Sequence, residues 1–481
     1  MALMEGLPTE LQQMIFDYLP IMDLAAISIS SKKLHSTVEQ VLYRSIAFSK
    51  CSHPGGERPC IDWEQETWNR LMGLLETMVK QPNLASSIRI FELETHGTLE
   101  IDVSDDGINT EWKDYYDCTV ERPSSEMMRH LKDLMPGIMV HENRNTNDEI
   151  MKCWTKAILE FDWDAAIALV LVLGNNLQTI KIAEQCEGKY WITSHHLSLR
   201  FPKYVPLVAG AAAMSKRMAG ERRLLANLRQ AEVPNYRMVD LCPNPWIHIP
   251  SLGELTMSTL FPEFRYWAGG PSFLLDAEET KHCGLRALDL SFVNLEHHDF
   301  ESFLKSCGGG LHNLKLRTPG KYERSPNIWE AVSAYAPNLE KLTLVDCNLW
   351  EEAQERDLSK MLQLKAFSFS FSSRFSPDVD PAKDDPEWYL LLPQRLEELA
   401  ITGCPETPKG WDFFDSVDSL VEVTHFGEFP ALRSIRVDFH LLECTNAMIE
   451  FKRGVIGVRC LEMTAMSGRK VQVSTNAAVL R

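Results

Sequence analysis

The chain has 481 residues, 44% of them hydrophobic, which is enough for a large core and about two to four domains. Its 67 acidic and 49 basic side chains give a net charge of −18, which argues against general affinity for nucleic acid or anionic membranes. The longest apolar run, residues 165–173, is far too short to cross a bilayer.

Cysteine usage indicates the compartment. Twelve cysteines are spread along the chain without a Cys-x-x-Cys pair, and no Asn-x-Ser/Thr acceptor for glycosylation occurs. Both features are typical of a protein in the reducing cytoplasm or nucleus, where cysteines serve as small buried apolar residues. We therefore expect a cytoplasmic or nuclear location.

A first short helix is predicted near the start of the chain. Its apolar stripe has steps of three and four residues and consists of Leu7, Leu11, Met14, Ile15, Tyr18 and Leu19. Pro8 suits a first helical turn, where the missing N–H costs nothing, and Pro20 ends the helix.

Two further short helices follow. Asp23 stands where the N-cap of the second helix is expected, and Leu24 and Ile27 begin its apolar face. The third helix is expected to carry Leu34, Val38, Val41, Leu42 and Ile46. So small a module needs a metal, a disulfide or a partner, and residues 1–50 contain no paired cysteines or ligand cluster. A protein partner is therefore expected.

Together these residues resemble an F-box. The residues that carry the resemblance are Leu7-Pro8-x-Glu10, Ile15, Leu19-Pro20, Asp23-Leu24, Ser28, Ser30-Ser31-Lys32-Lys33-Leu34-His35 and Leu42-Tyr43. F-boxes dock on the Skp adaptor of cullin-RING ubiquitin ligases. The resemblance implies an adaptor-binding set, some of which must instead hold the module's own core: Leu7, Pro8, Leu11, Ile15, Leu19, Leu24 and Leu34. A tryptophan often found near the end of the motif is absent here. The alternative is an ordinary three-helix lead-in to the next domain.

A different pattern begins near residue 84: leucine, two residues, an aliphatic residue, one residue, and another aliphatic residue. Its copies are Leu84-Ile88-Ile90 in an irregular form, Leu177-Ile180-Ile182, Leu252-Leu255-Met257, Leu285-Leu288-Leu290, Leu311-Leu314-Leu316, Leu339-Leu342-Leu344, Leu364-Phe367-Phe369, Leu396-Leu399-Ile401 and Leu432-Ile435-Val437. The copies that start at 285, 311, 339 and 364 are 26, 28 and 25 residues apart, a spacing typical of leucine-rich repeats. The last two apolar residues share one face of a short strand because they are two apart.

Helical patterns separate these strands, for example at Ile328 to Tyr335 and at Leu358 to Leu362. A strand and a helix per unit bury their apolar faces only by stacking on neighbours, as in a leucine-rich-repeat solenoid. The alternative is that such matches arise by chance in a leucine-rich chain, above all before residue 280.

We therefore expect an α/β chain, with a small helical F-box followed by an irregular leucine-rich-repeat solenoid. The expected domains are the F-box at 1–50, a linker and helix at 51–83, an irregular repeat-like region at 84–280 with an acidic insertion near 100–121, and a leucine-rich-repeat region at 281–481 with an insertion near 375–387.

Motifs for catalysis or cofactor binding are missing from the sequence. There is no Gly-x-Ser-x-Gly elbow, no phosphate-binding loop, no dinucleotide fingerprint and no His-Glu-x-x-His. Cys51, His53 and Cys60 could contribute to a zinc site, but no fourth ligand has a suitable spacing. We expect a non-catalytic chain without a cofactor or metal.

The two halves together resemble F-box leucine-rich-repeat proteins, the substrate receptors of SCF-type cullin-RING ubiquitin ligases. The resemblance implies that the first module binds the Skp adaptor, and that the strand face holds a protein substrate whose identity the sequence does not reveal. The residues expected to face the substrate alternate with the buried aliphatic residues: Asp289, Lys315, Arg317, Thr343, Arg436 and Asp438. The basic ones suggest an acidic or phosphorylated substrate segment. The alternatives are a ligase-independent scaffold or anchoring protein, and an enzyme with its site in residues 84–280.

Overall fold

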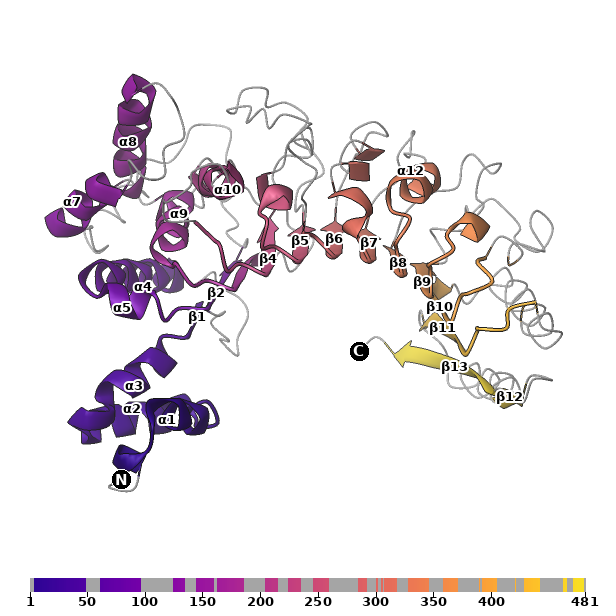
Figure 1. The fold of residues 1–481 in the computed structure, drawn as a ribbon, viewed down its shortest axis with the longest axis horizontal. Helices are drawn as coiled ribbons and strands as arrows, with labels where there is room; N and C mark the ends of the chain where they lie inside the picture. The colour runs from indigo at the N-terminus through magenta and orange to yellow at the C-terminus, as the bar shows by residue number, and fades with distance from the viewer. Residues whose placement is uncertain are drawn as a thin grey trace. The chain divides into compact units, whose positions relative to one another are not determined.

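The structure is a computed structural model, drawn in Figure 1. It divides the chain into two compact units. Unit 1 contains Met1–Tyr236, Pro245–Leu255 and Ala268–Phe273, and unit 2 contains Arg237–Asn244, Thr256–Trp267 and Leu274–Arg481. The residues that the structure describes are 4–48, 61–96, 124–134, 144–159, 162–185, 204–214, 224–234, 245–258, 284–291, 300–301, 304–305, 307–317, 328–345, 358–370, 389, 392–404, 420, 428–441, 462–464 and 470–479.

Unit 1 begins with a module of short helices: η1 (Met4–Gly6), α1 (Thr9–Phe16), α2 (Ile21–Ser30) and α3 (Lys32–Leu42). Pro8 and Pro20 are the N-cap residues of α1 and α2, with extended backbone at ψ 146° and 149°. The prediction of an N-cap at Asp23 is wrong, because Pro20 already starts the helix and Asp23 lies in its first turn. Ser31 caps α3, since its Oγ accepts a hydrogen bond from Leu34 N–H at 3.3 Å.

The three helices enclose one small core. Its centre consists of Phe16, Leu24, Leu34 and Val38, all at most 4% exposed. Five half-buried side chains pack around that centre: Met4, Leu19, Ile27, Val41 and Leu42. The predicted apolar positions of the second and third helices face this core. The stripe predicted for the first helix is instead mostly exposed, and the core contacts of that region come from Phe16 and Leu19.

The prediction that Ile46 extends the third helix is wrong. Helix α3 ends at Leu42, and Ile46 lies in strand β1 (Ser45–Phe48), which pairs in parallel with β2 (Ile90–His96). Ile46 and Phe48 are two apart and both half-buried, so the strand period applies here rather than the helical one. Arg44 O also accepts hydrogen bonds from Arg89 N at 2.9 Å and Ile90 N at 3.1 Å. The helical module therefore continues directly into the first strand of unit 1.

Further strands follow in chain order: β3 (Thr179–Gln185) and β4 (Gln230–Pro234) in unit 1, and β5 (Glu254–Ser258), whose first two residues belong to unit 1 and the rest to unit 2. The pairs β2–β3 and β3–β4 are parallel, and Gly253 N and Glu254 N both donate to Arg229 O at the start of β5. The inward side chains of these strands are buried: Phe91, Leu93, Ile180, Ile182, Ala231, Val233, Leu255 and Met257. Of these, Phe91, Ile180 and Ala231 are successive register partners, and so are Leu93 and Ile182.

This register corrects the first predicted copy of the apolar pattern. Ile90 is half-buried, while Phe91 and Leu93 pair with Ile180 and Ile182 and are fully buried. The copy is therefore Ile88-x-x-Phe91-x-Leu93 and not Leu84-Ile88-Ile90. A further copy, Leu228-x-x-Ala231-x-Val233, ends in β4. It was missed because the small alanine stands where the other copies have a larger aliphatic or aromatic residue.

Helical segments of unit 1 come between these strands in the sequence: α4 (Ile61–Lys80), α5 (Pro82–Ala85), α7 (Ser125–Leu134), α8 (Arg144–Leu159), α9 (Trp163–Leu173), α10 (Tyr204–Met214) and η5 (Pro245–His248). Every residue of α9 is buried. Asp164, 1% exposed, accepts hydrogen bonds from Tyr204 N at 2.7 Å and Val205 N at 3.1 Å, which caps the start of α10.

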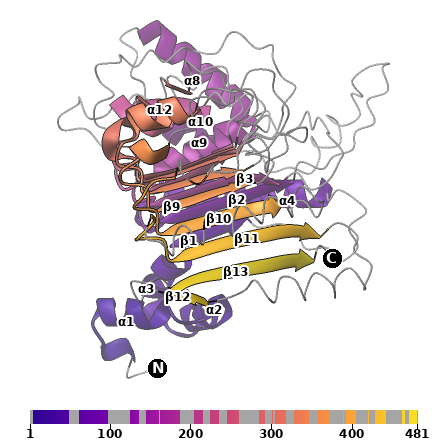
Figure 2. The same cartoon turned by 90° about the vertical axis from the view of Figure 1, so that its right-hand side faces the viewer.

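The described residues of unit 2 include these strands: β6 (Ala287–Ser291), β7 (Asn313–Arg317), β8 (Lys341–Val345), β9 (Ala366–Ser370), β10 (Glu398–Cys404), β11 (Ser434–Leu441), β12 (Glu462–Thr464) and β13 (Lys470–Val479). Neighbours from β6 to β11 pair in parallel in chain order, β11 pairs in parallel with β13, and β12 is antiparallel to β13 (Figure 2). The buried residues of these strands form register-aligned rows, one of which is Leu288, Leu314, Leu342, Phe367, Leu399 and Ile435.

Helical segments of unit 2 include η7 (Gly308–Gly310), α12 (Ile328–Tyr335) and η8 (Leu358–Lys360). α12 lies on one side of the strands, as Figure 1 shows. The helix predicted at Leu358 to Leu362 is a single 3₁₀ turn, because Leu364 N already bonds Met361 O ahead of β9. The insertions predicted near 100–121 and 375–387 lie outside the described residues.

Candidate docking surfaces

Large apolar side chains are exposed on α1 and α2. On α1 they are Leu11 at 46%, Met14 at 59%, Ile15 at 39% and, just after the helix, Tyr18 at 87%; on α2 they are Ile21 at 72%, Met22 at 79% and Ile29 at 88%. On the opposite side of α1, the side chains of Gln12 and Phe16 are buried. Apolar side chains gathered on one helix without cover indicate a surface that binds a partner. We call Leu11, Met14, Ile15 and Tyr18 the α1 patch.

The predicted adaptor-binding residues fall into two groups. Pro8, Leu11 and Ile15 are exposed, and Leu7 is half-buried. Leu24 and Leu34 are 4% and 0% exposed and belong to the core, against which Leu19 packs. Burial removes Leu24 and Leu34 from direct contact with any partner, so they can act only by holding the helices in place.

Several exposed residues were absent from the predicted set. Met14 and Tyr18 belong to the apolar stripe that the sequence predicts for the first helix. In the structure their side chains are exposed, and neither packs in the core. Ile21 and Met22 directly follow Pro20, in a first turn where polar residues are common. That unusual apolar start of a helix is the signal that could have identified them.

Polar contacts hold the N-terminal segment against the helices. Gln12 Nε2 donates to Met4 O at 3.0 Å and to Leu7 O at 2.9 Å, and Ser31 Oγ donates to Glu5 Oε1 at 2.7 Å. These contacts fix the segment that leads into α1 and so place Leu7 and Pro8 beside the α1 patch.

One ion pair joins the end of α1 to the start of the sheet. Both Asp17 carboxylate oxygens lie 2.7 Å from Arg44 Nη1. The pair is about 40% exposed, so its contribution to stability is about 1 kcal/mol or less.

Comparison with known families identifies this module. Residues 4–44 match the F-box domain. The match spans α1, α2 and α3, and it confirms the F-box identified from the sequence. F-box domains bind Skp adaptors of cullin-RING ligases, and F-box proteins are typically non-catalytic adaptors of substrates. A search of curated proteins found no match to the chain.

A second candidate surface is the side of β6–β11 opposite to the buried apolar rows. Asp289, Lys315 and Thr343 are successive register partners on β6, β7 and β8. Lys315 Nζ lies 2.6 Å from Asp289 Oδ2, so the structure brings these two predicted residues into an ion pair. Thr343 is half-buried and Arg317 is exposed at the end of β7.

The two remaining predicted residues lie on β11. Arg436 is exposed, and its backbone pairs with Ala400 of β10. Asp438 also lies in β11, where its backbone pairs with Asn476 of β13. Sequence reasoning missed Lys341, which is exposed on β8 and pairs with Asn313. Its position just before the first inward leucine of the strand was the signal for it.

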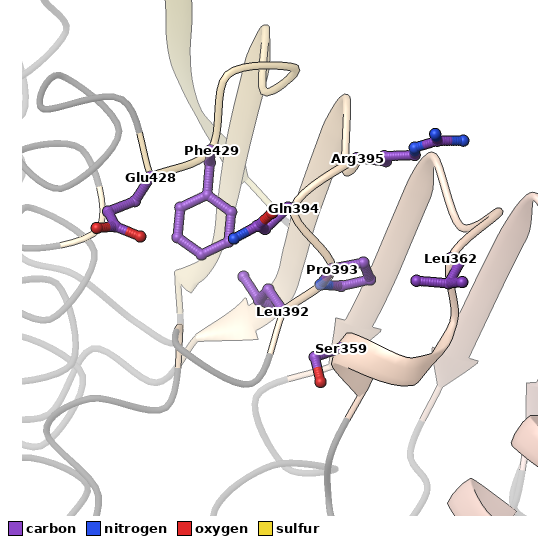
Figure 3. Close-up of a pocket in the computed structure, with 8 residues that line it drawn as sticks. All are labelled: Ser359, Leu362, Leu392, Pro393, Gln394, Arg395, Glu428 and Phe429. Atoms are coloured by element: carbon purple, nitrogen blue, oxygen red, sulfur yellow. The ribbon is translucent and has the colours of Figure 1, made fainter.

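A cavity of about 260 Å³ lies at the turns that precede β9, β10 and β11 in unit 2. Its lining consists of Ser359, Leu362, Leu392, Pro393, Gln394, Arg395, Glu428 and Phe429. Figure 3 shows Glu428 and Arg395 at opposite sides of this lining, with the polar Gln394 and the apolar Phe429, Leu392 and Pro393 between them. The lining contains no histidine or cysteine.

The part of the chain that the structure describes contains no group of three or more His, Cys, Asp or Glu able to hold a metal ion. Cys51, His53 and Cys60, the residues considered for zinc, lie outside the described residues. Among the helices whose positions are described, none has both the length and the apolar composition needed to cross a membrane.

Proposed function

We propose that this chain is the substrate-recognition subunit of an SCF-type cullin-RING ubiquitin ligase. The observation that carries the proposal is the α1 patch, exposed on a module that matches the F-box domain. The F-box binds the Skp adaptor through Leu7, Pro8 and the α1 patch, and the remaining chain binds a protein substrate. The chain itself is non-catalytic, because holding the substrate near the ligase converts ubiquitin transfer into a proximity-assisted step.

We further propose that the strands of each unit belong to irregular leucine-rich repeats of the solenoid type. The support is the parallel pairing in chain order, together with the aligned buried rows of Leu-x-x-Leu-x-Leu residues. Each strand buries alternate residues and leaves the others on the opposite side, which is the side available to a substrate. The short connection between α3 and β1 supports a fixed spacing between the F-box and the first strands.

The test measures binding of the purified chain to the Skp adaptor. A Leu11→Asp/Ile15→Asp variant places two charges in the proposed interface and is expected to lose adaptor binding while keeping its thermal unfolding midpoint. The matched control is Leu362→Asp, which adds a charge at a leucine that is 66% exposed in unit 2 and is expected to bind normally. Undiminished binding of the folded double variant would contradict the proposal.

A further inference from the structure

The open side of β7 and β8 in unit 2 is cationic, in a chain that carries a net charge of −18. Residues 313, 315 and 317 of β7 and 341, 343 and 345 of β8 occupy this side, since they alternate with buried leucines. They include three cations, Lys315, Arg317 and Lys341, and no carboxylate. The sign of this face therefore differs from that of the whole chain.

Only part of this positive charge is compensated within the described residues. Lys315 is paired with Asp289 of the neighbouring strand at 2.6 Å. Arg317 and Lys341 are exposed, and neither forms an ion pair with any residue whose position is described. Two cations thus remain for a ligand on this face.

The strand register sets the spacing of the two cations. Lys341 pairs with Asn313, and Arg317 is four residues beyond Asn313 along β7. Four residues of strand span about 13 Å, and neighbouring strands lie about 4.8 Å apart. The two positions are therefore about 14 Å apart, close to the roughly 13 Å that separates residues i and i+4 on one side of an extended peptide. The register pair between the two cations is Thr343 with Lys315, whose charge is already paired with Asp289.

The corresponding face of unit 1 is a contrast within the same chain. There Glu92 is paired with Lys181 at 2.7 Å, and Glu232 and Glu254 add negative charge on β4 and β5. The excess of positive charge on β7 and β8 is therefore local to these strands and is not a general property of the strand faces.

We propose that the β7–β8 face binds an extended acidic segment of the protein substrate, in which Asp or Glu carboxylates four residues apart contact Lys341 and Arg317. This proposal rests on the proposed function, since it assigns the substrate class of a ligase receptor. A nucleic acid is the poorer ligand, because a chain of net charge −18 repels a polyanion that extends beyond one small patch.

The test uses the full chain in complex with the Skp adaptor and a defined fluorescent probe. The probe is a serine- and threonine-rich peptide with three glutamates spaced four residues apart, and its isomer has the three glutamates adjacent. Fluorescence anisotropy measures both affinities between about 50 and 200 mM salt. An Arg317→Glu/Lys341→Glu variant is compared with Arg70→Glu/Lys80→Glu, which makes the same charge change at exposed positions of α4.

The spaced peptide is expected to bind the wild-type chain more tightly than its isomer. It should lose about 3- to 30-fold in affinity with the β7–β8 variant, since exposed ion pairs are individually weak. The α4 control should retain binding, and a spaced lysine peptide should bind the β7–β8 variant instead.

Equal binding of the two isomers, equal binding by the β7–β8 variant, or no binding by the folded wild-type chain would each overturn the acidic-segment proposal. A single-stranded oligonucleotide that bound this face more tightly than the peptide would also overturn it. Failure of the wild-type chain to bind the adaptor would instead contradict the proposed function. The β7–β8 variant should bind the adaptor normally, because its substitutions lie outside the F-box.

Discussion

Truncating the α1 patch should weaken adaptor binding without unfolding the F-box. Leu11, Met14 and Ile15 leave 46%, 59% and 39% of their surface exposed. Complete burial of such a side chain contributes about 1.5–3 kcal/mol, so burying the remaining fractions of all three contributes about 2–4 kcal/mol. The triple alanine variant should therefore bind the Skp adaptor about 30- to 700-fold more weakly.

Isothermal titration calorimetry with purified adaptor measures this change. Folding should persist, because alanine is the best helix former and exposed substitutions usually change stability by about 0.5 kcal/mol or less. The control is Leu362→Ala in unit 2, which also truncates an exposed leucine. A triple variant with an unchanged unfolding midpoint and wild-type affinity would refute the reasoning, since it would show that no partner covers this patch.

The remaining predictions concern stability. Phe16→Ala should destabilise the F-box by about 3–5 kcal/mol, because Phe16 is 0% exposed at the centre of its core; hydrogen exchange should accelerate in residues 4–44 and remain unchanged in β6–β9. Asp164→Ala should lower the unfolding free energy by about 2 kcal/mol or more, since two buried N–H groups of α10 lose their acceptor, and a loss below about 0.5 kcal/mol would disprove this role. Burial lowers the pKa of His248 below its usual 6.5, so the unfolded chain takes up the proton first and stability should fall as the pH drops through 6.5. In His248→Gln this part of the pH dependence, followed by thermal melts, should disappear.

Periodicity in the sequence was sufficient for the elements of the F-box and for most strands. The spacing of Leu7, Leu11 and Ile15 predicted α1, and the Leu-x-x-Leu-x-Leu copies between 285 and 440 correspond to β6–β11. The family match at residues 4–44 confirms the first of these interpretations. Both succeed because the apolar residues repeat with the period of the element that they form.

The pattern failed where two periods overlap or where a small residue replaces a large one. Ile46 fits both a helix that continues from Leu42 and a strand that includes Phe48, and only pairing with Phe91 decides between them. Ala231 is too small to mark an inward position by itself, yet its register partner Ile180 places it in the buried row. Local spacing carries no information about such partners.

The sequence by itself determined the F-box, the charge of −18 and the alternation of buried and available residues along the strands. Only the tertiary structure decided which apolar residues of the F-box face outward. Leu11 and Leu34 are both leucines at helical spacing, but Leu34 is covered by the core and Leu11 is exposed. It also decided which cations on β7 and β8 are paired, since the contact between Lys315 and Asp289 joins residues 26 positions apart in the chain. Burial and ion pairing depend on neighbours distant in sequence, and those neighbours are brought together only by the fold.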